Sequence, residues 1–127
     1  MSELKKVAAT NAPAAIGPYS AGIVANGFVF CSGQLPIDPG TGELVAGSLH
    51  DMTVQSMNNI RAVLEAAGSS VDKIVKTTIY VRDLAGFAEI NAAYGTFFQS
   101  TPPARACVEV SALPKGALVE IEAIAVL

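Results

Sequence analysis

Hydrophobic and polar residues alternate along several short runs of this chain, a pattern typical of β-strands with one buried face. Residues 21–25 (AGIVA) and 27–33 (GFVFCSG) flank Asn26 and Gly27, the strongest hairpin signal in a short sequence, so they predict an antiparallel pair. Residues 5–10 (KKVAAT) predict a short edge strand, and the Gly- and Pro-rich residues 11–22 predict a structured loop. Pro39, Gly40 and Gly42 predict a turn with a small hairpin around it.

Two later segments change to the helical repeat, with an apolar residue every three or four positions. The first helix is predicted to begin at Ser48 or Asp51, either of which can cap it, and to end at Gly68. The second is predicted to be capped by Asp83. The predicted buried stripes are Met57, Ile60, Leu64 and Ala67 on the first helix and Phe87, Ile90, Tyr94 and Phe97 on the second.

A β-branched, alternating run lies between these helices at residues 74–83 (IVKTTIYVRD). It predicts a strand with Val75, Thr77, Ile79 and Val81 on one side, reached by a β-α-β crossover. Residues 104–110 and 118–126 predict two last strands, paired most simply as an antiparallel hairpin. The prediction is an α+β fold, a mixed sheet with two helices on one face, in a single domain of residues 1–127.

Composition adds an expectation about assembly. Charged residues make up only 15% of the 127 residues and hydrophobic ones 51%, whereas an average globular protein has about 25% charged residues. So little charge leaves apolar surface uncovered, which predicts a homo-oligomer. The net charge of −3 makes nucleic acid an unlikely partner, because phosphate backbones are bound by basic surfaces.

Other signals are few. Cys31 and Cys107 lack CxxC spacing and predict reduced thiols, small buried side chains in a cytoplasmic protein. No metal site is predicted, because the lone His50 belongs to no ligand cluster, and no Gly-rich loop opens a helix for a nucleotide. The first 17 residues carry no export signal, and no segment has the length and apolarity of a membrane span.

The predicted strand at residues 104–110 places an arginine beside a cysteine. Ala104, Ala106, Val108 and Val110 are expected to face the core, with Arg105 and Cys107 on the other face; Glu120 and Glu122 share a face of the next strand. One interpretation is a structural Arg-Glu ion pair, between neighbouring strands or subunits. The other is a site in which Arg105 holds a substrate carboxylate and Glu120 handles a proton or water.

Strand register bears on this choice. In an antiparallel hairpin without a bulge, Arg105 and Glu120 share a face only if paired residue numbers have an odd sum. The sequence leaves that register open. An even sum would leave cooperation only through another subunit.

Five segments together resemble the RidA (reactive intermediate deaminase A, or YjgF) family: IGPYSAG, CSGQLPIDPGTGEL, AAGSSVDKIVKTTIYVRDL, FAEINAAYGTFF and PPARACVEVSALPKGALVEIEAIAV. They cover roughly residues 11–126. The resemblance implies a chorismate mutase-like fold and a homotrimer with three sites between subunits. It also implies cofactor-free hydrolysis of enamines and imines, such as 2-aminoacrylate and 2-iminobutanoate, to 2-oxo acids and ammonia.

Site residues follow from the matched segments. The resemblance makes Arg105 the anchor of the substrate carboxylate, helped by the backbone around Ser32 and Gly33. Without it, Ser32 would be interpreted as the end of a strand.

Four further residues match family positions. Tyr19 corresponds to the tyrosine that closes over the ligand, and Glu120 to the carboxylate that positions water. Cys107 corresponds to the position whose backbone touches the substrate nitrogen or that water, so its thiol need not be a nucleophile. Asn91 corresponds to a helix asparagine near the site. The structural alternatives are a packed loop for Tyr19 and a polar rim for Asn91.

The chain departs from many relatives at Ala106, where they carry Ser or Thr. Because alternation turns this side chain away from the face of Arg105, little effect on catalysis is expected.

Two other functions compete with the deaminase. One is a trimeric receptor that binds small 2-oxo or amino-acid-like carboxylates without turnover, which needs Arg105 but not Glu120. The other is the ribonuclease or translation-inhibitor activity reported for some family members, against which the acidic charge and the absence of a basic aromatic stripe both weigh.

Overall fold

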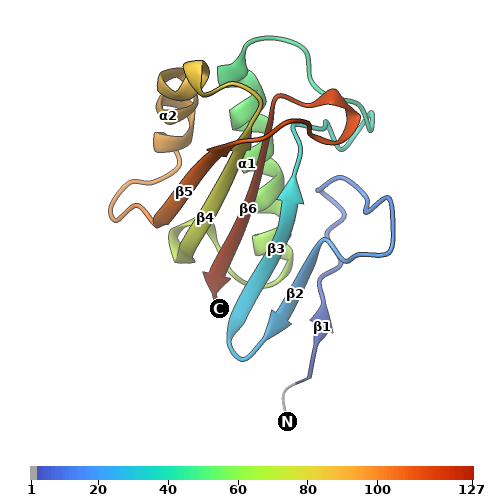
Figure 1. The fold of residues 1–127 in the computed structure, drawn as a ribbon. Coiled ribbons are helices and arrows are strands. Elements are labelled where there is room, and N and C mark those ends of the chain that lie inside the picture. Colours follow the sequence, from blue (N-terminus) through green and yellow to red (C-terminus); the bar gives the residue numbers. More distant parts are fainter. Residues whose placement is uncertain (1–2) are drawn as a thin grey trace.

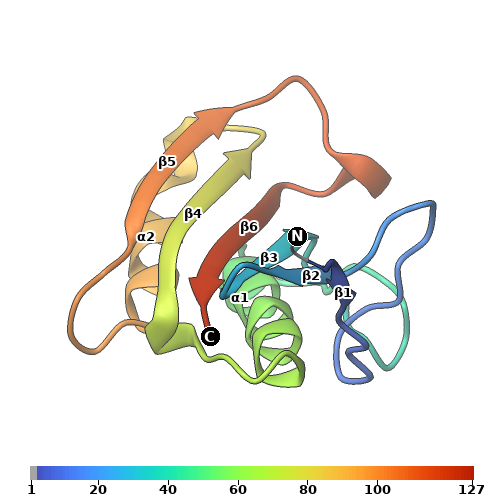
Figure 2. The same cartoon turned by 90° about the horizontal axis from the view of Figure 1, so that it is seen from below.

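The computed structural model describes residues 3–127, and its centre is one mixed sheet of six strands in the order β1-β2-β3-β6-β4-β5. Met1 and Ser2, which the predicted domain includes, lie outside the described residues. The strands are β1 (Lys5–Lys6), β2 (Gly22–Ala25), β3 (Phe28–Gln34), β4 (Ile74–Val81), β5 (Ala104–Glu109) and β6 (Val119–Val126). Helices α1 (Leu49–Ala66) and α2 (Phe87–Gly95) both cover the same face, as predicted (Figures 1 and 2).

The β2-β3 hairpin forms as the sequence predicts. Asn26 (φ 51°) and Gly27 (φ 79°) both have positive φ, the conformation of a tight turn that suits the strand twist. The predicted small hairpin is reduced to a single bridge between Ile37 and Leu44.

Both predicted helices are present. Ser48 is the cap of α1, since its Oγ accepts the Asp51 backbone N–H at 3.1 Å, and Gly68 follows the helix with φ 86°. Contrary to the prediction, Asp83 does not cap α2 itself. It caps a short 3₁₀ turn (Leu84–Gly86), and this turn leads into α2. On the stripe of α2, Ile90 and Tyr94 are buried whereas Phe87 is half-buried, and Phe97 lies beyond the helix end.

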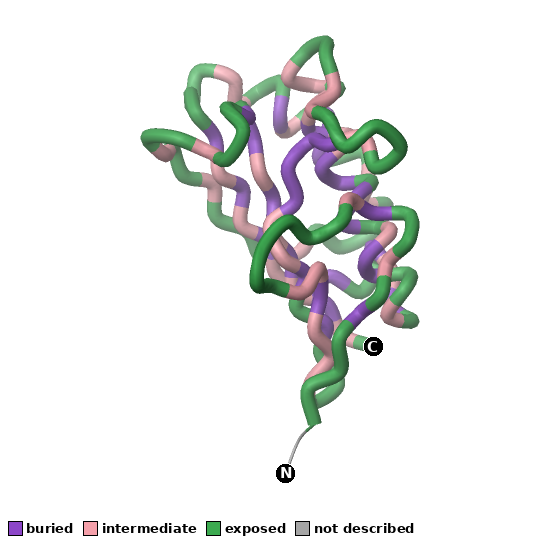
Figure 3. Tube along the Cα trace, turned by 90° about the vertical axis from the view of Figure 1, so that its right-hand side faces the viewer, coloured by how far each residue is buried: buried purple, intermediate pink, exposed green. Residues whose placement is uncertain are grey.

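The core lies between the sheet and the helices, and Figure 3 marks the buried residues along the chain in purple. Met57 and Ile60 of α1 are fully buried in one cluster with Ile79 of β4 and Ile121 of β6. Along β4 the prediction is wrong at one position. An extra residue shifts the β4-β6 register between Ile74 and Lys76, so Ile74 is buried and Val75 is 42% exposed.

The last two strands do not form the predicted hairpin. Strand β5 pairs with β4 in parallel at the edge of the sheet, and β6 lies between β3 and β4, antiparallel to both. The linker of residues 110–118, with its 3₁₀ turn (Pro114–Gly116), therefore carries the chain past β4 (Figure 1). The β3-α1-β4 crossover is confirmed, with β6 inserted between its two strands.

The two faces of β5 are also the reverse of the prediction. Ala104, Ala106 and Val108 are exposed on the helix-free face, whereas Cys107 packs against the core. In the described residues, no helix is long and apolar enough to cross a membrane.

Candidate functional site

A groove of about 660 Å³ lies over the helix-free face, where β3 ends and β6 begins. Its size is in the range of small-molecule sites. Four of the seven predicted site residues line it: Tyr19, Ser32, Gly33 and Glu120. Besides Glu120, the charged residues of the lining are Glu122 and Lys115. The rest of the lining is mostly apolar and consists of Pro13, Ala14, Ala15, Ile16, Ala21, Gln34, Leu35, Ile37, Pro39, Gly42 and Pro114.

A β-bulge shapes the floor of this groove. Cys31 pairs with Ala123 and Gln34 with Ile121, so Ser32 and Gly33 together oppose the single residue Glu122. The extra residue interrupts the alternation of side chains.

Gly33 lies directly under the Glu120 carboxylate. A Cβ on Gly33 would lie 2.8 Å from Oε2 and 2.9 Å from Cδ of Glu120. Because real Cβ atoms do not approach so closely, the observed position of this carboxylate requires a glycine.

Ser32 connects the sheet to the loop that carries Tyr19. Its Oγ donates a hydrogen bond of 2.6 Å to the Ser20 carbonyl, and its backbone N–H donates to the Ala21 carbonyl at 2.9 Å. The Ser32 hydroxyl thus fixes the base of the loop, while the Tyr19 side chain, 49% exposed, projects at the groove.

Burial and charge both act on Glu120. Partial burial raises the pKa of its carboxyl, and the neighbouring carboxylate of Glu122 raises that pKa further. A glutamate with a raised pKa is suited to accept and return a proton near neutral pH. Across the groove, Lys115 Nζ donates to the Gly42 carbonyl at 3.3 Å.

The other three predicted residues form a second cluster at β5 and α2. Arg105 Nη1 donates to Asn91 Oδ1 at 2.7 Å, and the guanidinium carbon lies 5.3 Å from the ring centroid of Phe87 and 5.2 Å from that of Tyr94. The Arg105 side chain itself is exposed.

Cys107 points toward the core from the same strand. Burial raises the pKa of its thiol, and the nearby charge of Arg105 lowers it to a smaller extent. A thiol with a raised pKa is a poor nucleophile at neutral pH, in agreement with the expectation that only its backbone takes part.

The two clusters lie on opposite faces of the sheet. Arg105 is in register with Thr77 on the helix face, whereas Glu120 is in register with Tyr80 on the helix-free face. An Arg105-Glu120 ion pair between neighbouring strands of one chain, one form of the structural interpretation, is therefore wrong, and the form between subunits stays a prediction. Within residues 3–127, no carboxylate lies at ion-pair distance from Arg105.

One contributor was not predicted from the sequence, and two others were assigned a different role. Lys115 was not identified as a groove residue, and nothing in the sequence placed its segment there. Phe87 and Tyr94 were assigned to the core alone, although their spacing from Asn91 puts all three on one side of a helix.

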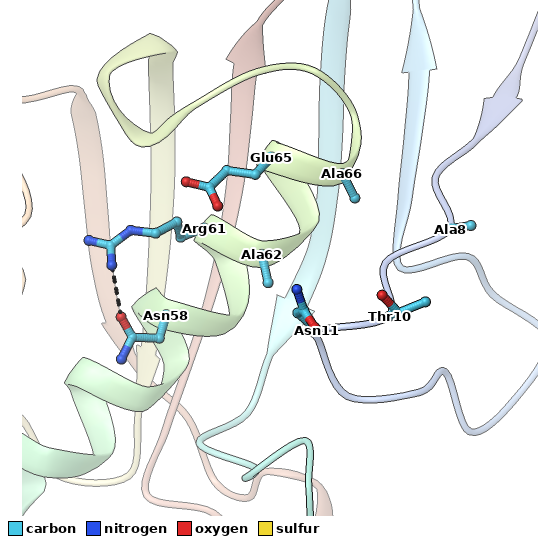
Figure 4. Close-up of a pocket in the computed structure, with 8 residues that line it drawn as sticks. All are labelled: Ala8, Thr10, Asn11, Asn58, Arg61, Ala62, Glu65 and Ala66. Carbon is cyan, nitrogen blue, oxygen red and sulfur yellow. Dashed lines mark hydrogen bonds between the residues drawn. The ribbon is translucent and has the colours of Figure 1, made fainter.

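A second groove, of about 530 Å³, lies between α1 and residues 8–11 (Figure 4). It contains none of the predicted site residues. Arg61 bonds to Asn58 at 3.4 Å, and Arg61 and Glu65 extend away from Asn11 and Thr10, so no polar groups converge there. As for metals, no three His, Cys, Asp or Glu side chains gather into a ligand set anywhere in residues 3–127.

Comparisons with known proteins agree with this architecture. The sequence profile of the family described as Endoribonuclease L-PSP matches residues 9–127. The chain is 52% identical over 125 residues to the 2-iminobutanoate/2-iminopropanoate deaminase of Salmonella typhimurium, covering 96% of this chain and 97% of that one.

Solved structures are equally similar. A Yersinia pestis protein of the conserved Rid family, YyfA, superposes with a TM-score of 0.95 at 50% identity, covering 98% of this chain and all (100%) of that one. Escherichia coli TdcF with bound serine superposes with a TM-score of 0.92 at 45% identity, covering 97% of this chain and 98% of that one. The chain belongs to the RidA/YjgF family, to which the L-PSP profile corresponds.

Proposed function

We propose that this protein is a cofactor-free hydrolytic deaminase of reactive 2-imino acids, and that each of its sites is completed by two copies of the chain. The observation that carries the proposal is the division of the predicted site between two places. The groove holds a carboxylate suited to proton transfer but not Arg105, and the β5-α2 cluster holds a guanidinium with no carboxylate partner in the described chain.

A homotrimer would bring the two clusters together. The helix-free face exposes apolar side chains, including Phe28, Phe30 and Val108, which are 39%, 45% and 42% exposed. Apolar surface of this kind is expected to be covered by another subunit. Strand β5 lies at the edge of the sheet, so a neighbouring copy can set its groove beside Arg105.

In this arrangement Arg105 of one copy holds the substrate carboxylate by two parallel hydrogen bonds. Glu120 of the other copy accepts a proton from a water molecule as the water oxygen attacks the carbon of the C=N bond. The proton passes from Glu120 to the nitrogen, which gives a carbinolamine. The hydroxyl proton of this intermediate then moves to the nitrogen through Glu120 as the C–N bond breaks, and ammonia and a 2-oxo acid leave. Tyr19 covers the groove, and the backbone at Ser32, Gly33 and Cys107 contacts the substrate or water.

Imines next to a carboxylate hydrolyse in water without a catalyst, so orientation and one activated water provide the required acceleration. The name of the Salmonella relative supports this reaction class, and the serine bound to TdcF supports an amino-acid-sized ligand.

The test is the rate of 2-oxo acid release from 2-aminoacrylate or 2-iminobutanoate made during the assay by a dehydratase. Wild type is expected to exceed the buffer rate, and Arg105→Ala to lose that excess. Arg61→Ala is the matched control, because Arg61 also lies over a ring, 5.0 Å from the Phe97 centroid, but far from the groove. Rates for wild type no higher than buffer would contradict the proposal.

A trimeric receptor without turnover is the second candidate, and the bound serine of TdcF favours it as much as the enzyme. Glu120→Gln separates the two. It should spare carboxylate binding and abolish turnover in a deaminase, whereas a receptor shows no turnover even in wild type.

A ribonuclease is the third candidate, because the matching family profile carries that name. The groove has two glutamates and one lysine, a poor surface for a phosphate backbone. Tight binding to single-stranded RNA that weakens with salt would support it.

A further inference from the structure

Three side chains of α2 surround the guanidinium of Arg105, and we call Phe87, Asn91 and Tyr94 the guanidinium cage. Phe87 and Tyr94 present their rings at 5.3 and 5.2 Å from the guanidinium carbon, within the range of cation–π contacts. Asn91 accepts one hydrogen bond from Nη1 at 2.7 Å. The three residues are four and three positions apart, so they share one side of the helix.

The cage is fixed to the sheet beneath Arg105. The Tyr94 hydroxyl hydrogen-bonds to Thr77 Oγ1 at 2.7 Å, and both residues are buried. Thr77 is the β4 residue in register with Arg105 on β5. The ring that flanks the guanidinium is therefore attached to the strand next to the one that carries it.

Every member of the cage is uncharged. An arginine is usually held in place by a carboxylate, which would neutralise it and compete with an anionic ligand. Here an amide oxygen and two ring faces hold the guanidinium, and the described residues 3–127 supply no carboxylate to it. The positive charge of Arg105 is left for a ligand, and so are its N–H donors other than the one that Asn91 accepts.

We propose that the guanidinium cage positions Arg105 without neutralising it, and so sets the affinity of the site for the substrate carboxylate; this rests on the proposed function. Phe87, Asn91 and Tyr94 act through Arg105 and are positioning residues. Because the carboxylate is bound in the ground state and the transition state alike, loss of the cage should raise KM much more than it lowers kcat.

The decisive variant is Asn91→Asp, which keeps the shape and the acceptor but gives Arg105 a carboxylate partner. We expect KM for the imine, and Kd for the product analogue 2-oxobutanoate, to rise at least about tenfold. The midpoint of thermal unfolding should not fall, since the new pair stabilises the fold. The matched control is Ala92→Asp, which adds the same charge at an exposed position next to the cage and should leave KM unchanged.

The aromatic part of the cage is tested separately. Phe87→Leu should raise KM severalfold, and Phe87→Tyr, which keeps a ring face, should restore it. If Asn91→Asp and Phe87→Leu both keep KM within about twofold of wild type while Arg105→Ala abolishes binding, the cage has no positioning role and the proposed function stands. If Arg105→Ala itself changes nothing, both proposals are wrong.

Discussion

Gly33→Ala tests whether the position of the Glu120 carboxylate matters for catalysis. The new Cβ would lie 2.8 Å from Oε2, whereas comfortable contacts begin near about 3.5 Å, so the carboxylate must move by roughly 0.7 Å. A misplacement of about 1 Å can cost about a hundredfold in rate, so kcat should fall about tenfold to a hundredfold.

The same substitution should hardly change stability. Only the end of a flexible side chain has to move, and replacing a glycine restricts the unfolded chain, an effect of about 0.4–1 kcal/mol in favour of folding where the backbone permits it. Gly33 is not among the glycines with positive φ, so alanine fits its backbone. The free energy of unfolding should stay within about 1 kcal/mol of wild type.

The assay is dehydratase-coupled 2-oxo acid release, with denaturant unfolding measured at equal protein concentration because assembly affects stability. Gly95→Ala is the control, since nothing lies within 4 Å of the Cβ position there. A kcat for Gly33→Ala within twofold of wild type, in a folded protein, would refute the reasoning.

Three further predictions concern charge, the thiol and the support of the groove. In Glu122→Gln, the pKa of Glu120 should fall because a like charge is removed. Since ionised Glu120 is the active form, the acidic limb of the plot of kcat/KM against pH should move to lower pH. An acidic limb that stays in place or moves to higher pH would count against this prediction. Cys107→Ala should keep at least about a third of the wild-type kcat, because a poorly ionised thiol is not the nucleophile, and loss of all activity would show otherwise. Asn59→Ala removes two hydrogen bonds to backbone carbonyls beneath the groove and one from a glutamine, each worth about 1 kcal/mol, and the better helix propensity of alanine offsets part of this loss. The free energy of unfolding should therefore fall by about 2–3 kcal/mol, whereas the control Asn58→Ala, at an exposed position, should lower it by under about 0.5 kcal/mol. Equal losses in the two variants would contradict this prediction.

Local signals in the sequence predicted local structure well. Asn26 and Gly27 fixed the hairpin, and Ser48 with Gly68 marked the ends of α1, because each of these residues acts through its own backbone or its nearest neighbours. Helix spacing identified Met57, Ile60 and Leu64 among the residues that α1 buries, whereas Ala67, the fourth predicted residue, is half-buried just beyond the helix end.

Strand order was beyond such signals. The insertion of β6 between β3 and β4 depends on which pairing buries the most apolar surface, and neither β5 nor β6 encodes its neighbour. The exposed alanines of β5 look like core residues in sequence, since alternation tells which residues share a face but not which face is covered. The extra residue at Val75 in β4 shifts the register, so Val75 is exposed although alternation placed it on the same side as Thr77.

For the site, residue types alone singled out Arg105 and Glu120 and left both an ion pair and a catalytic role open, and the resemblance assigned roles to all seven residues. The structure adds their separation into two clusters. It also adds the cage around Arg105, whose members look like an ordinary helical stripe in the sequence.

Subunit complementation tests the central claim most directly. Arg105→Ala and Glu120→Ala, each inactive alone, would be unfolded together in equal amounts, refolded, and assayed for 2-oxo acid release. If every site takes Arg105 from one copy and Glu120 from another, random mixing gives one site in four both intact residues, so about a quarter of wild-type activity should return. A mixture as inactive as its two components, although the chains have exchanged, would contradict a site shared between copies.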